Sequence, residues 1–207
     1  MKIKTLLLGN MQTNGYVVSD ENHHCLIIDP GANGKKVVHY LTENELVPEA
    51  VLLTHGHFDH IGAVDYLYEH YHCPIYLHQD DLEMLDNPQL NLSVYENPFT
   101  VKAPVQSSHE EMKFGDFDVQ WLHLPGHCPG SSMIYLKDEN IIFSGDVLFK
   151  GSIGRFDFPN SSKYETIESI NKIKEYDFDA VIYPGHGPNS TLSEERLNNP
   201  YLKRKGE

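Results

Sequence analysis

VLLTHGHFDH, residues 51–60, joins a short apolar run to a segment in which four of seven residues can bind metal. The apolar run Val51–Leu53 predicts a buried strand, so the segment Thr54–His60 lies on the loop that leaves this strand. Three imidazoles and a carboxylate this close together are typical of a metal site, because zinc and similar cations prefer these side chains. The stretch therefore predicts a metal-binding loop at a strand end.

Three later loops each add one donor beside glycine or proline: Pro125-Gly126-His127, Ser144-Gly145-Asp146 and Pro184-Gly185-His186. Tight turns at such residues can aim a side chain away from the core. The resulting pool of candidate ligands is His55, His57, Asp59, His60, His127, Asp146 and His186. Seven donors exceed the needs of one tetrahedral ion and predict two ions, with three imidazoles on one, two imidazoles and a carboxylate on the other, and a second carboxylate between them.

Chain length and net charge limit the kinds of protein that this sequence can encode. The chain has 207 residues, of which 40% are hydrophobic, and this suffices for one domain over residues 1–207 with a packed core. The formal net charge of −14 disfavours nucleic acid as a partner, because like charges repel. Only Lys203-Arg204-Lys205 resembles a basic patch.

Three widely spaced cysteines, Cys25, Cys73 and Cys128, form no disulfide framework and favour a reducing compartment. The apolar run Leu6–Leu8 is too short for the core of a signal peptide. No stretch approaches the roughly 18 apolar residues needed to cross a bilayer. We therefore expect a cytoplasmic protein without a membrane partner.

Hydrophobic spacing predicts the order of elements. Short strands open the chain, and helices are expected over residues 35–46, 61–71 and 162–176, with strands near 51–53, 74–77, 117–124, 132–136, 140–143 and 180–183. Residues 79–108 look irregular, with one short helix near 80–85, and would cover a site. This order suits two sheets packed face to face with helices outside.

The four motifs T-H-G-H-F-D-H, P-G-H-C-P-G, S-G-D-V-L-F and P-G-H-G together resemble those of the metallo-β-lactamase superfamily, in the same order and over nearly the whole chain. Within it the sequence is most similar to small glyoxalase II-like, or hydroxyacylglutathione hydrolase-like, metallohydrolases. The resemblance implies an α+β fold, the four-layer αββα sandwich, with metals at one edge of the two sheets. No separate C-terminal helical domain is expected, since only residues 189–207 follow the last motif.

The resemblance also implies roles for single residues. His55, His57 and His127 would hold the first metal ion, Asp59, His60 and His186 the second, and Asp146 would bridge them. Zinc is the expected metal, with iron or manganese as alternatives. Asp29 would orient ligands rather than bind metal, although an aspartate before Pro30-Gly31 also suits a plain turn.

The implied activity is hydrolysis of a thioester of the S-lactoylglutathione type, a small-molecule acyl-thiol, by attack of a hydroxide that bridges the metals. Asp59 and Asp146 would then be the catalytic carboxylates. Arg155, in the segment Gly154-Arg155-Phe156-Asp157, falls where the family anchors a carboxylate of glutathione. An ordinary surface pair between Arg155 and Asp157 is the competing interpretation.

Other functions stay open at this point. A mononuclear iron persulfide dioxygenase shares the fold and would use His55, His127 and Asp146 alone. A phosphodiesterase is disfavoured by the acidity of the chain, and a non-enzymatic metal-binding module by the spread of donors over several loops. Antibiotic hydrolysis is disfavoured by the missing export signal. His78, His109, His123 and Cys128 are interpreted as packing or rim residues.

Overall fold

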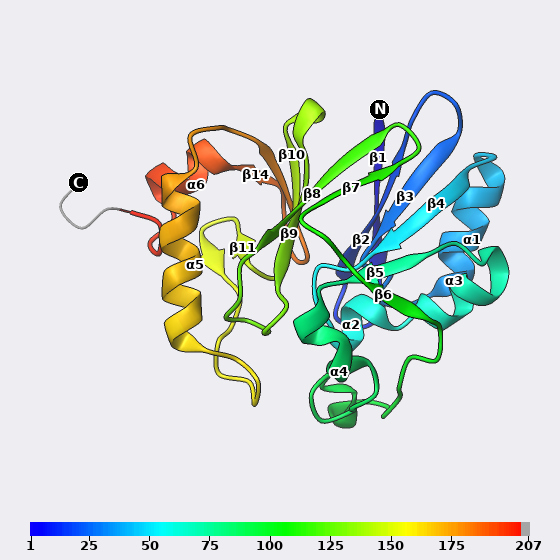
Figure 1. Cartoon of the computed structure of the whole chain (residues 1–207), viewed down its shortest axis with the longest axis horizontal. Coiled ribbons are helices and arrows are strands. Elements are labelled where there is room, and N and C mark those ends of the chain that lie inside the picture. The colour runs from blue at the N-terminus through cyan, green and yellow to red at the C-terminus, as the bar shows by residue number, and fades with distance from the viewer. Residues whose placement is uncertain (204–207) are drawn as a thin grey trace.

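The computed structural model describes residues 1–203 and contains two six-stranded sheets that face each other (Figure 1). The first sheet has the strand order β1 (Lys2–Leu8), β2 (Thr13–Ser19), β3 (His24–Ile28), β4 (Val47–Leu52), β5 (Ile75–Leu77) and β6 (Val105–Ser107). The second has the order β14 (Ser190–Thr191), β13 (Val181–Pro184), β10 (Ile141–Gly145), β9 (Ser132–Leu136), β8 (Phe117–His123) and β7 (Glu111–Phe114). A ribbon of β11 (Leu148–Phe149) and β12 (Ser152–Ile153) lies beside the second sheet.

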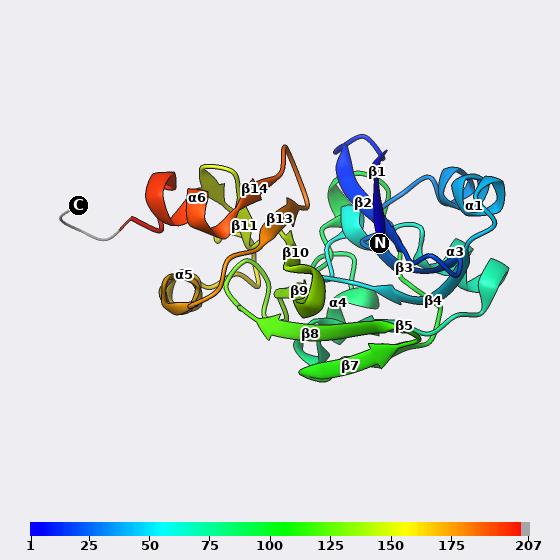
Figure 2. The ribbon, with the colours of Figure 1, turned by 90° about the horizontal axis from the view of Figure 1, so that it is seen from above.

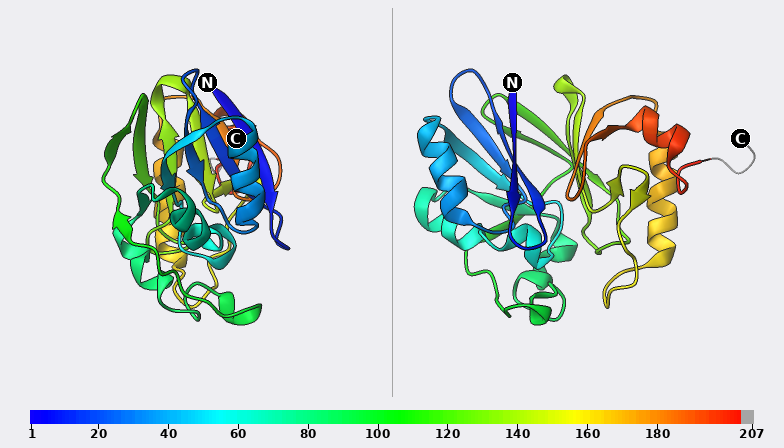
Figure 3. Two further views of the ribbon diagram at one scale, coloured as in Figure 1. Left: turned by 90° about the vertical axis from the view of Figure 1, so that its right-hand side faces the viewer. Right: turned by 180° about the vertical axis from the view of Figure 1, so that it is seen from behind.

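Helices cover the outer face of each sheet. Seen from above, α1 (Gly34–Glu43) and α3 (Val64–Tyr71) lie outside the first sheet, and α5 (Lys163–Glu175) and α6 (Leu192–Asn198) lie outside the second (Figure 2). The view from behind in Figure 3 gives the same arrangement. The short helices are α2 (Phe58–Ile61), α4 (Leu82–Leu85), η1 (Gln79–Asp81), η2 (Ser93–Tyr95) and η3 (Lys137–Glu139). The predicted four-layer αββα sandwich is confirmed.

Three apolar layers hold the four structural layers together. Cys25 and Ile27 of β3 face the α1 and α3 side, whereas Leu26 and Ile28 face the second sheet. Successive side chains of a strand point to opposite faces, so a strand covered on both sides must be apolar throughout. This explains why the run H-C-L-I-I shows no polar alternation. A third cluster lies between the second sheet and α5.

Strand direction brings the loops with metal-binding residues to one edge. β3, β4 and β5 pair in parallel, so the loops after them start from the same edge of the first sheet. In the second sheet β10 pairs in parallel with β13, and Gly145 lies opposite Pro184. Asp146 and Gly185, the next residues, therefore leave the sheet side by side. The helix α2 lies at this edge, which is the lower one in Figure 1.

Several predicted boundaries were wrong. The expected helix over 61–71 starts earlier and is divided into α2 and α3, with Gly62 at the end of the first part. The stretch 79–108 was expected to be irregular, yet it ends in β6, which pairs with β5. The helix α6 was not predicted at all.

The predicted domain of residues 1–207 extends four residues beyond the described range, and Arg204 and Lys205 of the basic tail lie outside that range. Within residues 1–203, every helix is either too short or too polar to cross a bilayer.

We expect Phe143→Ala to lower the free energy of unfolding by about 3–5 kcal/mol, because it leaves a cavity between the two sheets. Phe143 is 1% exposed and packs against Tyr16 at a ring distance of 5.0 Å. Tyr164→Ala, at a 73% exposed position on α5, is the control and should cost under about 0.5 kcal/mol. Urea unfolding at fixed metal content measures both, and equal effects would contradict this account of the core.

Candidate metal centre

The seven predicted donors come together at the shared sheet edge. Five of them lie on the loops that follow β4, β8, β10 and β13, and Asp59 and His60 lie on the short helix α2, which continues the first of these loops. Among residues 1–203, three groups of side chains at this edge have ligand atoms that all lie within 4.8 Å of one another: His55, His57, His127 and Cys128; His55, His60 and Asp146; and Asp59, His60 and His186. A fourth such group, His78, Asp80 and His123, shares no residue with them. The overlap between the first three groups makes them one connected cluster.

Three imidazoles form the first donor set, His55, His57 and His127, and the Cys128 thiol lies beside them. His127 Nε2 lies 2.9 Å from His57 Nδ1, and the ring of His55 packs edge to face on both neighbours at 4.8 and 4.9 Å. The exposed fractions are 1% for His55, 3% for His57 and 7% for His127. Three buried rings with converging nitrogens form a compact trigonal set.

The second donor set, Asp59, His60 and His186, contains a carboxylate. His186 Nε2 lies 3.2 Å from Asp59 Oδ2, and His60 Nε2 lies 3.5 Å from the same oxygen. Asp146 lies between the two groups, since its Oδ1 is 3.4 Å from His60 Nε2 and its Oδ2 is 3.6 Å from His127 Nε2. One carboxylate therefore contacts both donor sets.

Unpaired buried atoms test whether metal fits this arrangement. His55 Nε2, His60 Nε2 and Asp146 Oδ1 are buried and find no hydrogen-bond partner among residues 1–203. A buried polar group left unpaired costs about 1–3 kcal/mol. Since cations bound to these atoms would remove that cost, the donor set fits metal.

Electrostatics agree with this assignment. Burial lowers the pKa of His55 well below its usual value and that of His57 to about 3, and it also lowers the pKa of His127. These rings are neutral at pH 7, which is the form that coordinates metal. Burial would also lower the pKa of His60, but Asp59, Asp146 and Asp29 together raise it well above its usual value. The carboxylates thus attract positive charge to the second group.

Hydrogen bonds from outside the donor set fix its orientation. Asp29 is 2% exposed, and its Oδ1 accepts a bond from the Thr54 amide at 2.8 Å. Its Oδ2 accepts from Thr54 Oγ1 at 2.6 Å and lies 2.9 Å from His60 Nδ1. Thr13 Oγ1 donates to Asp59 Oδ2 at 2.8 Å, and His127 Nδ1 lies 2.7 Å from the carbonyl oxygen of Arg155. These contacts direct the other ring nitrogens of both histidines toward the cluster.

Asp81 joins two of the ligand loops, and the sequence analysis did not identify it. It is fully buried, its Oδ2 accepts a hydrogen bond from the Gly56 amide at 3.0 Å, and its Oδ1 accepts one from the Gly130 amide at 2.6 Å. Burial raises the pKa of this carboxyl to about 7, although both amide bonds oppose the shift. Gly56 lies between His55 and His57, so Asp81 ties their loop to the His127 loop.

Two glycines are required by close packing at the centre. A β-carbon on Gly185 would lie 2.3 Å from Asp146 Oδ1, and one on Gly130 would lie 2.7 Å from the carboxyl carbon of Asp81. Real β-carbons do not approach other atoms so closely. Any side chain at these two positions would displace a donor or its support.

Arg155 lies at the rim of the centre and not inside it. Its guanidinium is 67% exposed and donates two hydrogen bonds to Asp157, at 2.8 and 2.9 Å. It also stacks 4.5 Å above the ring of Phe158, which packs against His57 at 5.3 Å. The surface pair with Asp157 is therefore present, on a platform that touches the donors.

Of the remaining candidate side chains, His78, His109 and His123 lie outside the groups formed by the seven donors, and only Cys128 contacts a donor. His78 and His123 stack on each other at 3.8 Å and border a surface pocket that His109 also lines. His123 Nε2 lies 2.8 Å from the Pro129 carbonyl oxygen. Cys128 is buried with its Sγ 3.3 Å from His57 Nε2, and burial raises the pKa of its thiol well above the usual value. A neutral thiol at this position packs against the donors.

Several known proteins are similar to this chain. The family model of the metallo-beta-lactamase superfamily matches residues 8–186. A protein named probable metallo-hydrolase YqgX from Bacillus subtilis is 39% identical over 98% of both chains. Hydroxyacylglutathione hydrolase GloC from Haemophilus influenzae is 32% identical over 99% of this chain and 100% of its own.

Two crystal structures are also similar to the chain. The B3 metallo-beta-lactamase BLEG-1 has a TM-score of 0.92 and 37% identity, over 98% of this chain and 100% of that one. TTHA1623 in a di-iron-bound form has a TM-score of 0.86 and 37% identity, over 96% of this chain and 100% of that one.

We expect Asp81→Asn to weaken metal binding by about 10- to 100-fold, as is typical when a residue that supports ligands is changed. The amide has one acceptor oxygen, so one glycine N–H would face an NH2 group instead. Asp86→Asn, at an exposed position five residues further on, is the matched control. Competition with a chromogenic chelator measures affinity, and an Asp81→Asn protein that binds metal like the control would refute the role of Asp81.

Proposed function

The chain belongs to the metallo-beta-lactamase superfamily, and we propose that within it the protein is a dinuclear metallohydrolase that cleaves small thioesters of the S-lactoylglutathione type. The observation that carries this proposal is the position of Asp146, 3.4 Å from His60 and 3.6 Å from His127. A carboxylate that contacts two donor sets is suited to bridge two ions.

Two ions account for the donors better than one. His55, His57 and His127 would hold the first ion, and Asp59, His60 and His186 the second. Divalent ions bound there would polarise the thioester carbonyl and make water acidic enough to act as the nucleophile at neutral pH. A single iron on His55, His127 and Asp146 would leave the Nε2 atom of His60 buried and unpaired, at the cost given above.

The chain's own residues then have distinct tasks. Asp59 is held by Thr13 and lines the cavity beside the centre, so its carboxylate is placed to orient the attacking water. His60 and His186 lower its pKa against the effect of burial, so it is ionised at neutral pH. The leaving thiol needs no strong general acid, because the pKa of a thiol is about 8.5.

Similarity to GloC supports a hydroxyacyl-thiol as the substrate, since that relative is named a hydroxyacylglutathione hydrolase. Arg155 supports it as well, because a guanidinium binds carboxylates through two hydrogen bonds and lies above Phe158 at the rim. A carboxylate of the thiol carrier would replace Asp157 as the hydrogen-bond partner of this guanidinium. The expected metal is zinc, and similarity to the di-iron form of TTHA1623 supports iron as the alternative.

Hydrolysis of β-lactams is a second candidate, because BLEG-1 is named a B3 metallo-beta-lactamase and is 37% identical. Both reactions attack a carbonyl carbon with water and differ in the leaving group. An amide nitrogen leaves less readily than a thiolate and needs a proton from the site. The buried Cys128 and the paired Arg155 are poor proton donors, so the residues favour the thioester.

Metal analysis is expected to give two ions per chain for the wild-type protein and one for His186→Ala, since this change removes one of the three donors of the second group. Elemental analysis after gel filtration measures the ratio. Lys150→Ala, an exposed change outside the donor set, should keep two ions. One iron per wild-type chain, unchanged in His186→Ala, would favour the mononuclear dioxygenase.

Protein loaded with two ions should hydrolyse S-lactoylglutathione with a kcat/KM of about 10⁴ M⁻¹ s⁻¹ or more, the lower range for enzymes on their substrates. Asp59→Asn should lower kcat by about 100-fold or more, because an uncharged amide binds a metal ion and orients the attacking water less well than a carboxylate. Release of the thiol measures both rates. A β-lactam is tested in parallel by its hydrolysis, and glutathione persulfide by oxygen uptake at an electrode. Turnover of either of these without any thioester cleavage would replace the proposed function.

A further inference from the structure

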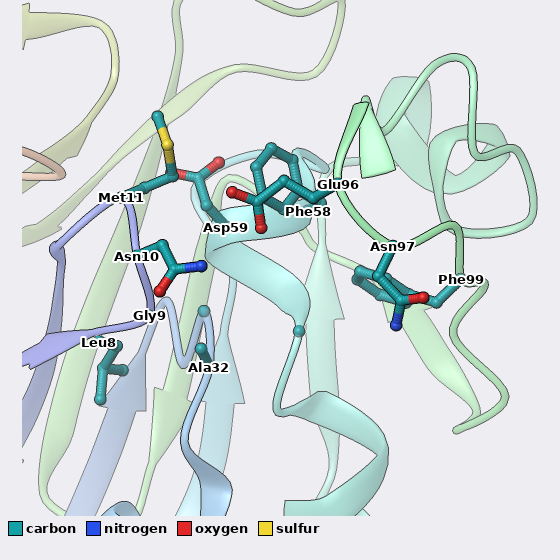
Figure 4. A pocket seen from close by; sticks show the side chains of 12 residues that line it. Leu8, Gly9, Asn10, Met11, Ala32, Phe58, Asp59, Glu96, Asn97 and Phe99 are labelled. Carbon is teal, nitrogen blue, oxygen red and sulfur yellow. The ribbon is translucent and has the colours of Figure 1, made fainter. Parts of the chain in front are cut away.

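A cavity of about 200 Å³ opens directly beside the metal centre (Figure 4). Its walls come from four parts of the chain: the β1–β2 turn with Asn10 and Met11, the loop after β3 with Ala32, the helix α2 with Asp59, and the segment from Glu96 to Phe99. By volume it holds about six water molecules, taking about 30 Å³ for each. It therefore has room for a short chemical group and not for a long chain.

Asp59 belongs to both the cavity and the centre. Its side chain is 13% exposed, and its Oδ2 lies 3.2 Å from His186 Nε2. Any molecule that fills the cavity therefore touches the centre. Phe158 packs against the rings of His57 and His127 at 5.3 and 5.7 Å, and Arg155 stacks on Phe158. The two arms of the centre are thus the rim with Arg155, next to His57 and His127, and this cavity, next to Asp59.

The rim and the cavity suit the two ends of a thioester substrate. The rim offers a guanidinium for carboxylates of the thiol carrier. The cavity offers apolar surface from Met11, Phe58 and Phe99. With the carrier toward Arg155 and the carbonyl at the centre, the acyl chain points into the cavity.

Glu96 sets the charge of the cavity. It forms no ion pair with residues 1–203, and the lining residues in that range include no lysine, arginine or histidine. In the view of Figure 4 its carboxylate is directed toward Asp59. When Asp59 binds metal, Glu96 is the only charged side chain without a partner among the cavity-lining residues within 1–203.

We propose that this cavity binds the acyl group of the substrate and that Glu96 makes it prefer uncharged acyl groups over those that end in a carboxylate. The inference rests on the proposed thioester hydrolysis and specifies its acyl group. Glu96 is exposed, so solvent screens its charge and the preference should be modest, about two- to fivefold for a matched pair of substrates.

Two thioesters of N-acetylcysteamine test the charge preference, because this carrier is uncharged and leaves Arg155 out of the comparison. Their acyl groups are glutaryl and its amide glutaramoyl, which have nearly equal size and differ in charge. Wild-type kcat/KM, corrected for spontaneous hydrolysis, should favour glutaramoyl. Glu96→Gln should bring the ratio to about one by raising the glutaryl rate, and Glu96→Lys should reverse it.

Glu139→Gln is the matched control, since Glu139 is exposed on η3, before the strand β10 whose other end carries Asp146. It should keep the wild-type ratio. Equal wild-type rates for the two thioesters, or a ratio unchanged in Glu96→Gln, would overturn the role of Glu96.

A second variant tests the occupant of the cavity. Ala32→Leu adds volume at the cavity wall and should lower kcat/KM for the pentanoyl thioester by about tenfold while sparing the acetyl thioester. An equal loss for both would mean that the carrier fills the cavity, which contradicts the inference. Cleavage of no thioester at all, S-lactoylglutathione included, removes the proposed function and this inference with it.

Discussion

The carboxylate of Asp29 holds the end of β3 against the end of β4, and the geometry of the metal-binding loop depends on this contact. It accepts hydrogen bonds from the amide and the hydroxyl of Thr54 and also contacts Nδ1 of His60, and all of these groups are buried. Asp81 acts in the same way between the loops after β4 and β8. A hydrogen bond to a charged group contributes about 1.5–3 kcal/mol. Two buried carboxylates that lie outside the donor groups therefore keep the loops of both sheets in register.

Short-range sequence patterns were enough to predict the four layers of the fold but not the elements at the edges of these layers. Buried strands such as β3 are apolar on both faces, so a short run of five residues identifies them. The edge strand β6 is short and only partly buried, and its pairing with β5 defines it. The helix α6 buries Leu192 and Glu195 and shows too little apolar periodicity to be predicted. These elements depend on contacts with distant residues, which one sequence does not reveal.

The same distinction applies to the site. The seven donors could be found because each follows a strand and has glycine, proline or another donor nearby. Asp81 could not be found, because its partner Gly130 lies 49 residues away in the sequence. The residues next to Asp81 in the sequence form no motif that would indicate its role. The cavity needs residues 9–11 beside residues 96–99, a proximity that only the folded chain creates. For Arg155 the sequence allowed a substrate contact or a surface pair, and the structure contains the pair with Asp157.

Close packing divides the site into parts that can and cannot vary during evolution. A β-carbon on Gly31 would lie 1.5 Å from the Asp59 carbonyl oxygen, and Gly185 and Gly130 are also too confined for one. Substitutions at these glycines would damage every activity of the centre at once. The rim at Arg155 and the cavity wall at Glu96 are exposed and lie on loops, so substitutions there leave the packing intact. New substrate preferences can therefore arise by single changes at the rim while the chemistry of the centre is inherited unchanged.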